Sequence, residues 1–259
     1  MAIEFKSIPL KDKKIKFTIQ LEDINGITGN NRLDILDFLL FKRREGEILY
    51  NKEKIKPEEK KQFVSYVEEF ALSKYFQNKV IEAMYYELRR KGIDLKDPKK
   101  KILESLKIVG LPSAILERNL KFLSSSEKAL LRISIGLLSN PEILIIDEPF
   151  EELDKQNMQK VLLLFRRMTD QYNKTIIIIS NDMDMIYQYT DHCMILQENK
   201  VILEGYTREV LRKSEVLKKN GIKVPEMVEF TELANKKEKG KIDYHRDIRD
   251  IIKDIYKHV

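Results

Sequence analysis

The chain has 259 residues, which is enough for one large α/β domain with a small additional part. Hydrophobic residues make up 42% and charged residues 35%, a composition typical of a globular, soluble protein. No apolar run approaches the roughly 20 residues that are needed to cross a bilayer. If the protein acts at a membrane, we expect it to be a peripheral subunit. The net charge of +6 is spread over lysines without an aromatic stacking platform, and we therefore expect no nucleic acid partner.

The single cysteine, Cys193, excludes an internal disulfide and suits the reducing cytosol. It follows His192, and a lone His–Cys pair is more typical of packing than of a metal site. The N-terminal stretch MAIEFKSIPLKDKK lacks the pattern of a secretory signal. These features predict a protein of the cytoplasm.

The first part of the chain predicts a strand over residues 15–25, a loop over 26–34 and then an amphipathic helix. Strand, glycine loop and helix in this order are the setting of a phosphate loop, G-x-x-x-x-G-K-[ST], which binds phosphate through backbone N–H groups. The pattern by itself does not match, and only the position of this stretch upstream of the later motifs identifies it. The candidate nucleotide-binding residues are Gly26, Gly29, Asn30, Asn31, Arg32, Leu33 and Asp34.

Several adjacent residues of this loop differ from the phosphate-loop pattern. Asn31 takes the place of the second glycine and tolerates left-handed backbone angles better than most residues, so we expect the loop shape to survive in part. Arg32 keeps the positive charge of the lysine on a bulkier, planar group. Leu33 offers no oxygen to magnesium, and Asp34 adds a charge that repels phosphates. The loop is therefore expected to bind magnesium–ATP poorly.

The next stretches predict a hairpin at 46–51 and a strand at Phe63–Val67 that leads to Glu69. From about Leu72 to Leu120 the pattern is helical and highly charged. This region is either a separate helical unit or an ordinary amphipathic pair packed on the sheet.

The most informative stretch begins with a serine cluster at Leu123–Glu127, which opens a largely apolar helix that Pro141 ends. Ile143–Ile146 then predicts a buried strand, and it ends in Asp147–Glu148. Two carboxylates after an apolar strand are costly unless they meet a cation, and this edge of an α/β sheet is where ligands bind. We expect this strand to lie next to the one that enters Gly26.

This order and spacing resemble the ATP-binding cassette (ABC) family. Leu123–Glu127 corresponds to the signature motif, Asp147 and Glu148 to the Walker B motif, and Leu153–Asp154 to the loop that follows it.

The resemblance implies an α/β fold, namely an ABC ATPase nucleotide-binding domain with a P-loop NTPase-like core sheet and a helical subdomain. We expect this domain over residues 1–214, with the helical subdomain at about 72–122. A small C-terminal helical extension is expected over 215–259.

The resemblance also implies roles for the acidic residues. Asp147 would hold magnesium, and Glu148 would polarise water as the catalytic residue. Glu69 lies at the Q-loop position, where it lacks the amide donor of a glutamine. Asn181 follows a predicted strand at 175–179 and takes the position of the switch histidine, but it cannot carry a proton charge.

The signature motif is altered as well. Ser125 and Ser126 replace two glycines and add Cβ atoms where the family brings its backbone close to the phosphate bound on the opposite subunit. We therefore expect a weakened clamp rather than an abolished one. The signature residues are Ser124, Ser125, Ser126 and Glu127.

The C-terminal part predicts a closing hairpin at 193–205 and a helical tail from Glu215. The tail, with SEVLKKNGIKVPEMVEF, resembles that of energy-coupling factor ATPase subunits, where such an extension helps two ATPase subunits pair. The partners implied are a second ABC ATPase subunit and a multi-spanning membrane component, with this chain at the cytoplasmic face of the membrane.

The resemblance implies a subunit of an energy-coupling factor importer for vitamins or metals. The altered motifs lead us to expect a weakly hydrolysing or non-hydrolysing partner in a heterodimer, with ATP and Mg²⁺ as cofactors if any nucleotide is bound. One alternative is an active ATPase with Glu148 as general base and Arg32 in place of the lysine, which the intact Asp–Glu pair favours. Another is a scaffold or regulatory protein without a transporter, which the tail argues against.

Overall fold

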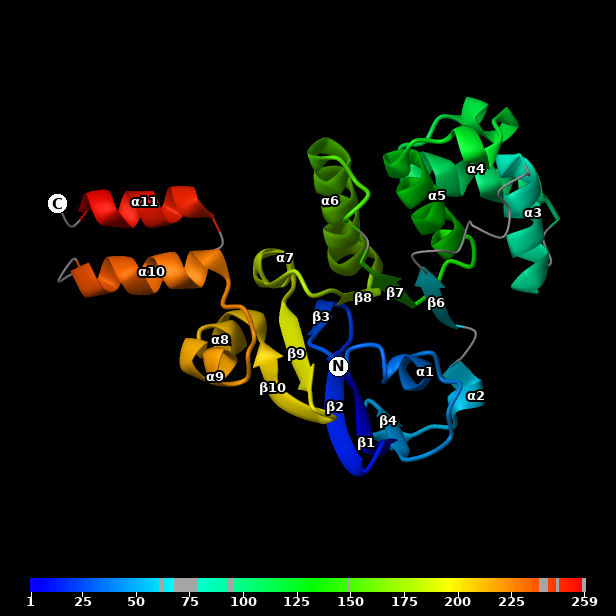
Figure 1. The fold of residues 1–259 in the computed structure, drawn as a ribbon. Helices are drawn as coiled ribbons and strands as arrows, with labels where there is room; N and C mark the ends of the chain where they lie inside the picture. The colour runs from blue at the N-terminus through cyan, green and yellow to red at the C-terminus, as the bar shows by residue number, and fades with distance from the viewer. Residues whose placement is uncertain are drawn as a thin grey trace.

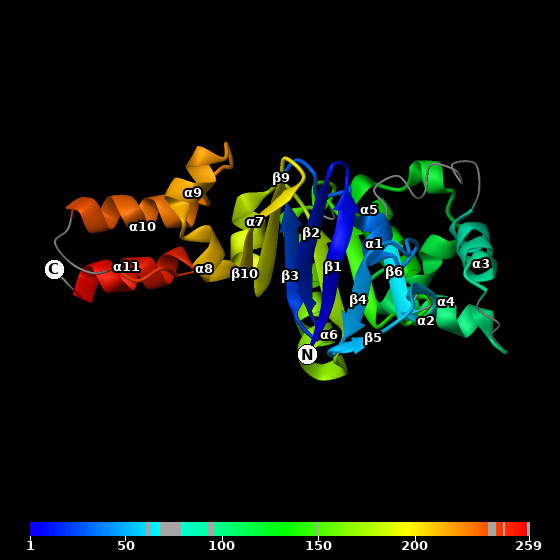
Figure 2. The same ribbon diagram turned by 90° about the horizontal axis from the view of Figure 1, so that it is seen from below.

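The computed structural model describes residues 1–60, 63–67, 79–92, 96–148, 150–237, 242–245 and 247–257. In this part of the chain a central sheet lies between helices on one face and a small antiparallel sheet on the other (Figures 1 and 2). The predicted Q-loop residue Glu69 lies outside the described residues.

Within the described ranges the central sheet has six strands in the order β10–β9–β3–β8–β7–β6, parallel except for β10. The strands are β3 (Ile24–Thr28), β6 (Val64–Val67), β7 (Ile143–Asp147), β8 (Thr175–Ile179), β9 (His192–Gln197) and β10 (Lys200–Tyr206). The expectation that β7 lies next to β3 is wrong, because β8 pairs with both and separates them. The carboxyl ends of the three strands nevertheless lie level, since Ile179 pairs with both Ile27 and Asp147.

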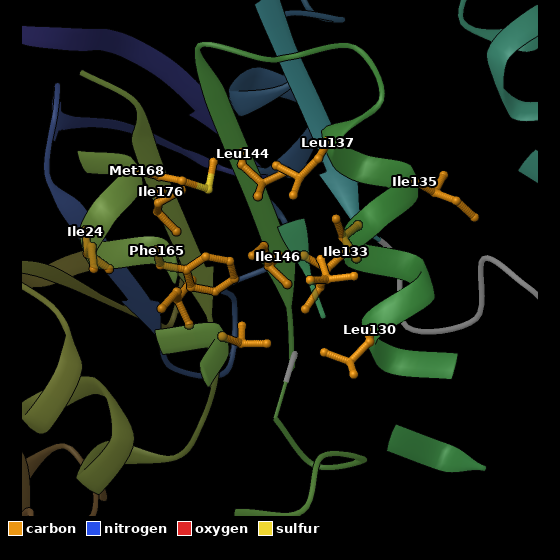
Figure 3. Packing of buried hydrophobic residues seen from close by; sticks show 14 of the residues in the cluster. Ile24, Leu130, Ile133, Ile135, Leu137, Leu144, Ile146, Phe165, Met168 and Ile176 are labelled. Atoms are coloured by element: carbon orange, nitrogen blue, oxygen red, sulfur yellow. The ribbon is translucent and has the colours of Figure 1, made fainter. Parts of the chain in front are cut away.

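Strand β7 is apolar at successive positions because both of its faces are covered, as is usual for parallel sheets. Leu144 and Ile146 belong to the core on the helical side, where they lie between Leu137 of α5 (Ser125–Leu137) and Phe165 of α6 (Lys155–Tyr172) (Figure 3). Ile143 and Ile145 belong to a second core, which the antiparallel sheet covers. This double burial fixes the strand and thereby the position of the carboxylates that follow it.

The antiparallel sheet has the order β2–β1–β4–β5. Its strands are β1 (Ala2–Leu10), β2 (Lys13–Gln20), β4 (Glu47–Tyr50) and β5 (Glu53–Lys54), and β4 and β5 form the predicted hairpin. The prediction of a single strand over residues 15–25 is wrong, because a turn at 21–23 separates β2 from β3. Within this turn Glu22 has φ +64°. The predicted helix after the loop is reduced to one turn, α1 (Leu36–Leu39).

The remaining helices of the domain are α2 (Pro57–Lys60), α3 (Val80–Arg90), α4 (Pro98–Ile108), the 3-10 turns η3 (Ser113–Glu117) and η4 (Leu120–Phe122), and α7 (Met183–Tyr189). Helices α3 and α4 lie beyond β6, at one end of the molecule (Figure 1). They occupy the region expected to form the helical subdomain, and α5 follows them with its N-terminus at the predicted signature.

The C-terminal part contains α8 (Thr207–Leu211), α9 (Ser214–Lys219), α10 (Glu226–Lys237) and α11 (Ile248–Lys257). Helices α10 and α11 lie side by side at the opposite end of the molecule from α3 and α4 (Figures 1 and 2). Among the described residues, none of the helices combines the length and apolar character needed to cross a bilayer.

The His–Cys pair packs as expected. The ring of His192 lies 4.3 Å from the ring of Tyr206 on the neighbouring strand, measured between centroids. Cys193 is buried, and this burial raises the pKa of its thiol to about 12.

Candidate nucleotide site

The carboxyl ends of β3, β7 and β8 bring five predicted or neighbouring residues together. Arg32 belongs to the loop after β3, Asp147 and Glu148 to the end of β7, and Ser180 and Asn181 to the segment after β8. The backbone extends this alignment by one residue, because the N–H of Glu148 donates to Ile179 O at 2.9 Å. The sheet therefore determines which side chains meet.

Both carboxylate oxygens of Glu148 are bonded within the chain. Oε1 accepts from Arg32 Nη2 at 3.3 Å and from the backbone N–H of Asn181 at 2.9 Å. Oε2 accepts from the hydroxyl of Ser180 at 2.6 Å. The Arg32 and Glu148 side chains are only 18% and 14% exposed, so this ion pair is shielded from water. The backbone of Glu148 has φ +39°, a left-handed value that few residues with side chains adopt.

Asp147 has a different environment from its neighbour. Its Oδ2 accepts from the hydroxyl of Tyr66 at 3.2 Å, and its Oδ1 is buried without a hydrogen-bond partner. Burial raises the pKa of this carboxyl above its ordinary value, while the Tyr66 hydrogen bond and the charge of Arg32 act in the opposite direction. Arg32 Nε is also buried without a partner, so the site contains an unmatched donor and an unmatched acceptor.

The backbone of the loop after β3 is bonded to other protein groups rather than open to a ligand. Four of its N–H groups donate to oxygens of the chain: Asn30 to Gln197 Oε1 at 3.2 Å, Asn31 to Leu196 O at 3.4 Å, Arg32 to Gly29 O at 3.1 Å and Asp34 to Asn31 O at 3.0 Å. A phosphate loop needs such groups pointing at the ligand. This loop must break several of these bonds before it can surround a phosphate.

Gly29 lies at the closest approach of the loop to β9. Its φ is +103°, and a Cβ built on it would lie 2.1 Å from the backbone oxygen of Leu196. Asn31, which tolerates left-handed backbone angles better than most residues, does not have a positive φ. Its side chain instead donates to Asp34 Oδ2 at 2.8 Å and accepts from the N–H of Asn199 at 3.1 Å. Gly26 lies inside β3 rather than in the loop.

These residues do not fit a complete site for magnesium and ATP. Leu33 is 42% exposed and offers no oxygen, and Asp34 is an exposed carboxylate beside it. The unpartnered Oδ1 of Asp147 points to one possible cation ligand, whereas magnesium needs near-octahedral oxygen coordination. Within the described residues, no group of three or more His, Cys, Asp or Glu side chains is placed to hold a metal.

The signature residues lie at the N-terminus of α5. Ser124 caps this helix, since its hydroxyl accepts from the N–H of Glu127 at 3.2 Å and its own N–H donates to Glu127 Oε2 at 2.8 Å. The Ser126 hydroxyl donates to Asp154 Oδ2 and accepts from the N–H of Asp154, both at 3.0 Å. Ser125 is exposed. The signature is thus joined to the N-terminus of α6, where Asp154 is the N-cap.

The structure adds residues that the sequence pattern did not single out. Tyr66 and Ser180 contact the two carboxylates, and Gln197 holds the loop after β3. Ser180 directly follows a buried strand at the same sheet edge, and this position was a signal that could have identified it. Tyr66 and Gln197 lie within strands, and no sequence pattern indicates that they contact the site.

Comparison with known proteins shows consistent similarities. A family model described as ABC transporter matches residues 13–151. The energy-coupling factor transporter ATP-binding protein EcfA2 of Caldanaerobacter subterraneus is 27% identical over 257 residues, covering 95% of this chain and 88% of that protein. The EcfA2 protein of Enterococcus faecalis is also 27% identical, over 218 residues, covering 81% of this chain and 75% of that protein.

Two solved structures share the fold. The structure of cbiO1 from Clostridium perfringens, part of the ABC transporter complex cbiONQ, has a TM-score of 0.69 at 22% identity and covers 89% of this chain and 98% of that chain. A dimeric ATP-binding cassette in a post-hydrolysis state, bound to ADP and phosphate, has a TM-score of 0.66 at 17% identity. It covers 80% of this chain and 99% of that chain. These matches confirm the α/β fold expected from the sequence.

Proposed function

Since the chain belongs to the ABC transporter family, we propose that it serves as the cassette subunit of an energy-coupling factor importer, in which it binds nucleotide weakly and hydrolyses little or none. The names of the similar EcfA2 proteins support the importer class, and so does the tail of the chain. The family in general binds ATP with magnesium. The cargo proposed is a vitamin or a metal ion, and a separate membrane subunit would select it.

The observation that carries this proposal is the bonding of Glu148. A general base must accept a proton from the attacking water, and every hydrogen bond that its carboxylate already accepts occupies one of roughly four lone-pair sites. In this chain Arg32, Ser180 and Asn181 bond to both oxygens of Glu148. Arg32 is also the residue expected to bind the phosphates. The candidate phosphate-binding cation and the candidate general base are therefore paired with each other.

We further propose that the chain works as half of a pair at the cytoplasmic face of a membrane. Helices α10 and α11 carry exposed apolar side chains, namely Phe230, Leu233, Ile248, Ile252 and Tyr256. The second subunit would be another ABC ATPase with a similar extension, and the pair would lie beneath a multi-spanning membrane component. In such a pair this chain supplies its phosphate loop to one site and its signature to the other.

The experiment is ATP hydrolysis by the complex that copurifies with the full-length chain, compared with hydrolysis by the isolated chain. The expected result is that the isolated chain is inactive, that the complex turns over, and that Glu148→Gln in this chain leaves the turnover within about twofold. The same substitution at the Walker B glutamate of the partner is the matched control, and it should abolish the activity. Turnover by the isolated chain that Glu148→Gln removes would contradict the proposal.

The second candidate, an active ATPase in the same role, is favoured by the intact pair Asp147 and Glu148, in which a buried oxygen of Asp147 has no partner within the chain. The hydrolysis experiment separates the two, because an active subunit loses turnover with Glu148→Gln. A variant with Arg32→Lys and Leu33→Ser gives a positive control for binding, since it restores a lysine and a hydroxyl to the loop. This variant should bind magnesium–ATP at least tenfold more tightly than the natural chain.

A further inference from the structure

Residues 220–226 join α9 to α10 and include the first residue of α10, and they bond to two side chains, Gln197 and Asp184, that lie beside the two segments bonded to Glu148. We call this segment the connector. One of its ends contacts the phosphate loop through Gln197, and the other contacts the segment after β8 through Asp184. Gln197 lies outside the motifs that identify the family, whereas Asp184 ends the stretch Ser180–Asp184 that surrounds the switch-histidine position.

Asp184 fixes the start of α10. Its Oδ1 accepts from the N–H of Glu226, the first residue of this helix, at 2.6 Å, and its Oδ2 accepts from Lys223 Nζ at 2.8 Å. The first N–H groups of a helix have no partner inside it, and a carboxylate there is favoured by the helix dipole. Asp184 itself lies in the first turn of α7, three residues after Asn181. The C-terminal helices are therefore anchored to the segment that bonds Glu148.

Gln197, at the end of β9, joins the other loop to the connector. Its Oε1 accepts from the N–H of Asn30 at 3.2 Å, and its Nε2 donates to Asn220 O at 3.4 Å. One side chain thus bonds the backbone of the phosphate loop and the backbone at the C-terminus of α9.

Glu148 closes this set of contacts into a ring. Its Oε1 accepts from Arg32 on the phosphate loop and from Asn181 after β8, and the connector links the same two segments on their other side. A shift of α10 therefore acts directly on the bond between Glu226 and Asp184, and it reaches Gln197 through the connector. The ring offers a direct physical route from the C-terminal helices to the nucleotide site.

From this ring we infer that Asp184 and Gln197 are positioning residues that couple α10 and α11 to the phosphate loop. The docking of the partner subunit on these helices then changes how the loop presents its N–H groups. Because such coupling is reciprocal, occupancy of the loop changes the affinity of the pair by the same factor. The identity of the partner rests on the function proposed above, whereas the coupling within the chain does not.

The experiment is amide hydrogen exchange, followed by mass spectrometry, on the full-length chain without nucleotide. With Asp184→Ala we expect exchange to rise about fivefold at the start of α10 and also at residues 29–34, because both hydrogen bonds that Asp184 accepts are lost. The matched control is Glu229→Ala, which removes an exposed 3.7 Å ion pair to Lys218 within the same C-terminal part. It should leave residues 29–34 unchanged.

Two further variants keep the inference open to refutation if Asp184→Ala impairs folding. Asp184→Asn keeps an acceptor for the N–H of Glu226 and should restore most of the protection. Gln197→Ala should raise exchange both at residues 29–34 and at the C-terminus of α9. If Asp184→Ala changes exchange only around α7 and α10, the coupling is refuted. This result would leave the proposed function intact, and ATP turnover by the isolated chain would refute that function without affecting the coupling.

Discussion

A double-mutant cycle of Glu148→Gln and Arg32→Met measures how strongly the loop after β3 is held to β7. The two substitutions remove the two charges of the ion pair, singly and together. Arg32 Nη2 and Glu148 Oε1 lie 3.3 Å apart, and the two side chains are 18% and 14% exposed. At this distance the attraction between unit charges is about 5 kcal/mol at an effective dielectric constant of about 20. The cost of removing both ions from water offsets much of it. Hydrogen bonds to charged groups contribute about 1.5–3 kcal/mol, and we expect a net coupling of about 2 kcal/mol.

The assay is a double-mutant cycle of urea unfolding on the isolated chain. Glutamine at position 148 still accepts from the N–H of Asn181 and can still bond to Ser180, so the substitution changes mainly the charge. The control is the same cycle on the exposed Lys218–Glu229 pair, which should give less than about 0.5 kcal/mol. A coupling for Arg32 and Glu148 as small as that of the control would show that this ion pair does not hold the loop to β7.

Three further predictions concern stability. Burial lowers the pKa of Lys91 from 10.5 to about 8, so between these values the folded chain binds fewer protons than the unfolded chain and stability rises with pH. Lys91→Met should flatten this rise between pH 8 and 10 in urea titrations, and an unchanged slope would contradict the assignment. Gly29→Ala should lower the free energy of unfolding by on the order of 2 kcal/mol more than Gly110→Ala. Alanine at position 29 adds a steric clash to the backbone strain, whereas alanine at position 110 adds the strain alone. Both glycines have positive φ, but only the Cβ at position 29 meets a backbone atom, so equal losses in urea unfolding would refute the clash. Ser126→Ala should cost about 1 kcal/mol because it removes two hydrogen bonds to the N-cap of α6, whereas the exposed Ser125→Ala should be close to neutral in the same unfolding assay.

The buried strands could be predicted well from the sequence. Ile143–Ile146 and Thr175–Ile179 are short apolar runs, and each ends in polar residues at the ligand-binding edge of the sheet. The helix that starts at Ser125 was also predictable, since its serine cap and Pro141 mark its limits. These elements are determined by local chemistry and by burial on both faces.

The elements around the phosphate loop were predicted less well. The turn at 21–23 contains no glycine or proline, so the pattern of β2 runs into β3 without a visible break. The helix after the loop ends after one turn, and Phe41 with φ +52° follows it. A bulky residue in this conformation cannot be anticipated from propensity, because tertiary packing imposes it.

The contacts of the site depend on residues far apart in the chain. Arg32 and Glu148 are separated by 116 positions, and Asn30 and Gln197 by 167. The order of the motifs predicted that Asp147 and Glu148 share a sheet edge with the loop. It could not predict that Arg32 pairs with Glu148 rather than with Asp147, because both carboxylates lie at this edge.

The most direct test of the account is calorimetric titration of magnesium–ATP into the isolated full-length chain at neutral pH. We expect no saturation below the millimolar range, because Arg32 of the loop after β3 and Glu148 are bonded to each other. Saturable binding in the micromolar range, lost in Arg32→Met, would contradict it.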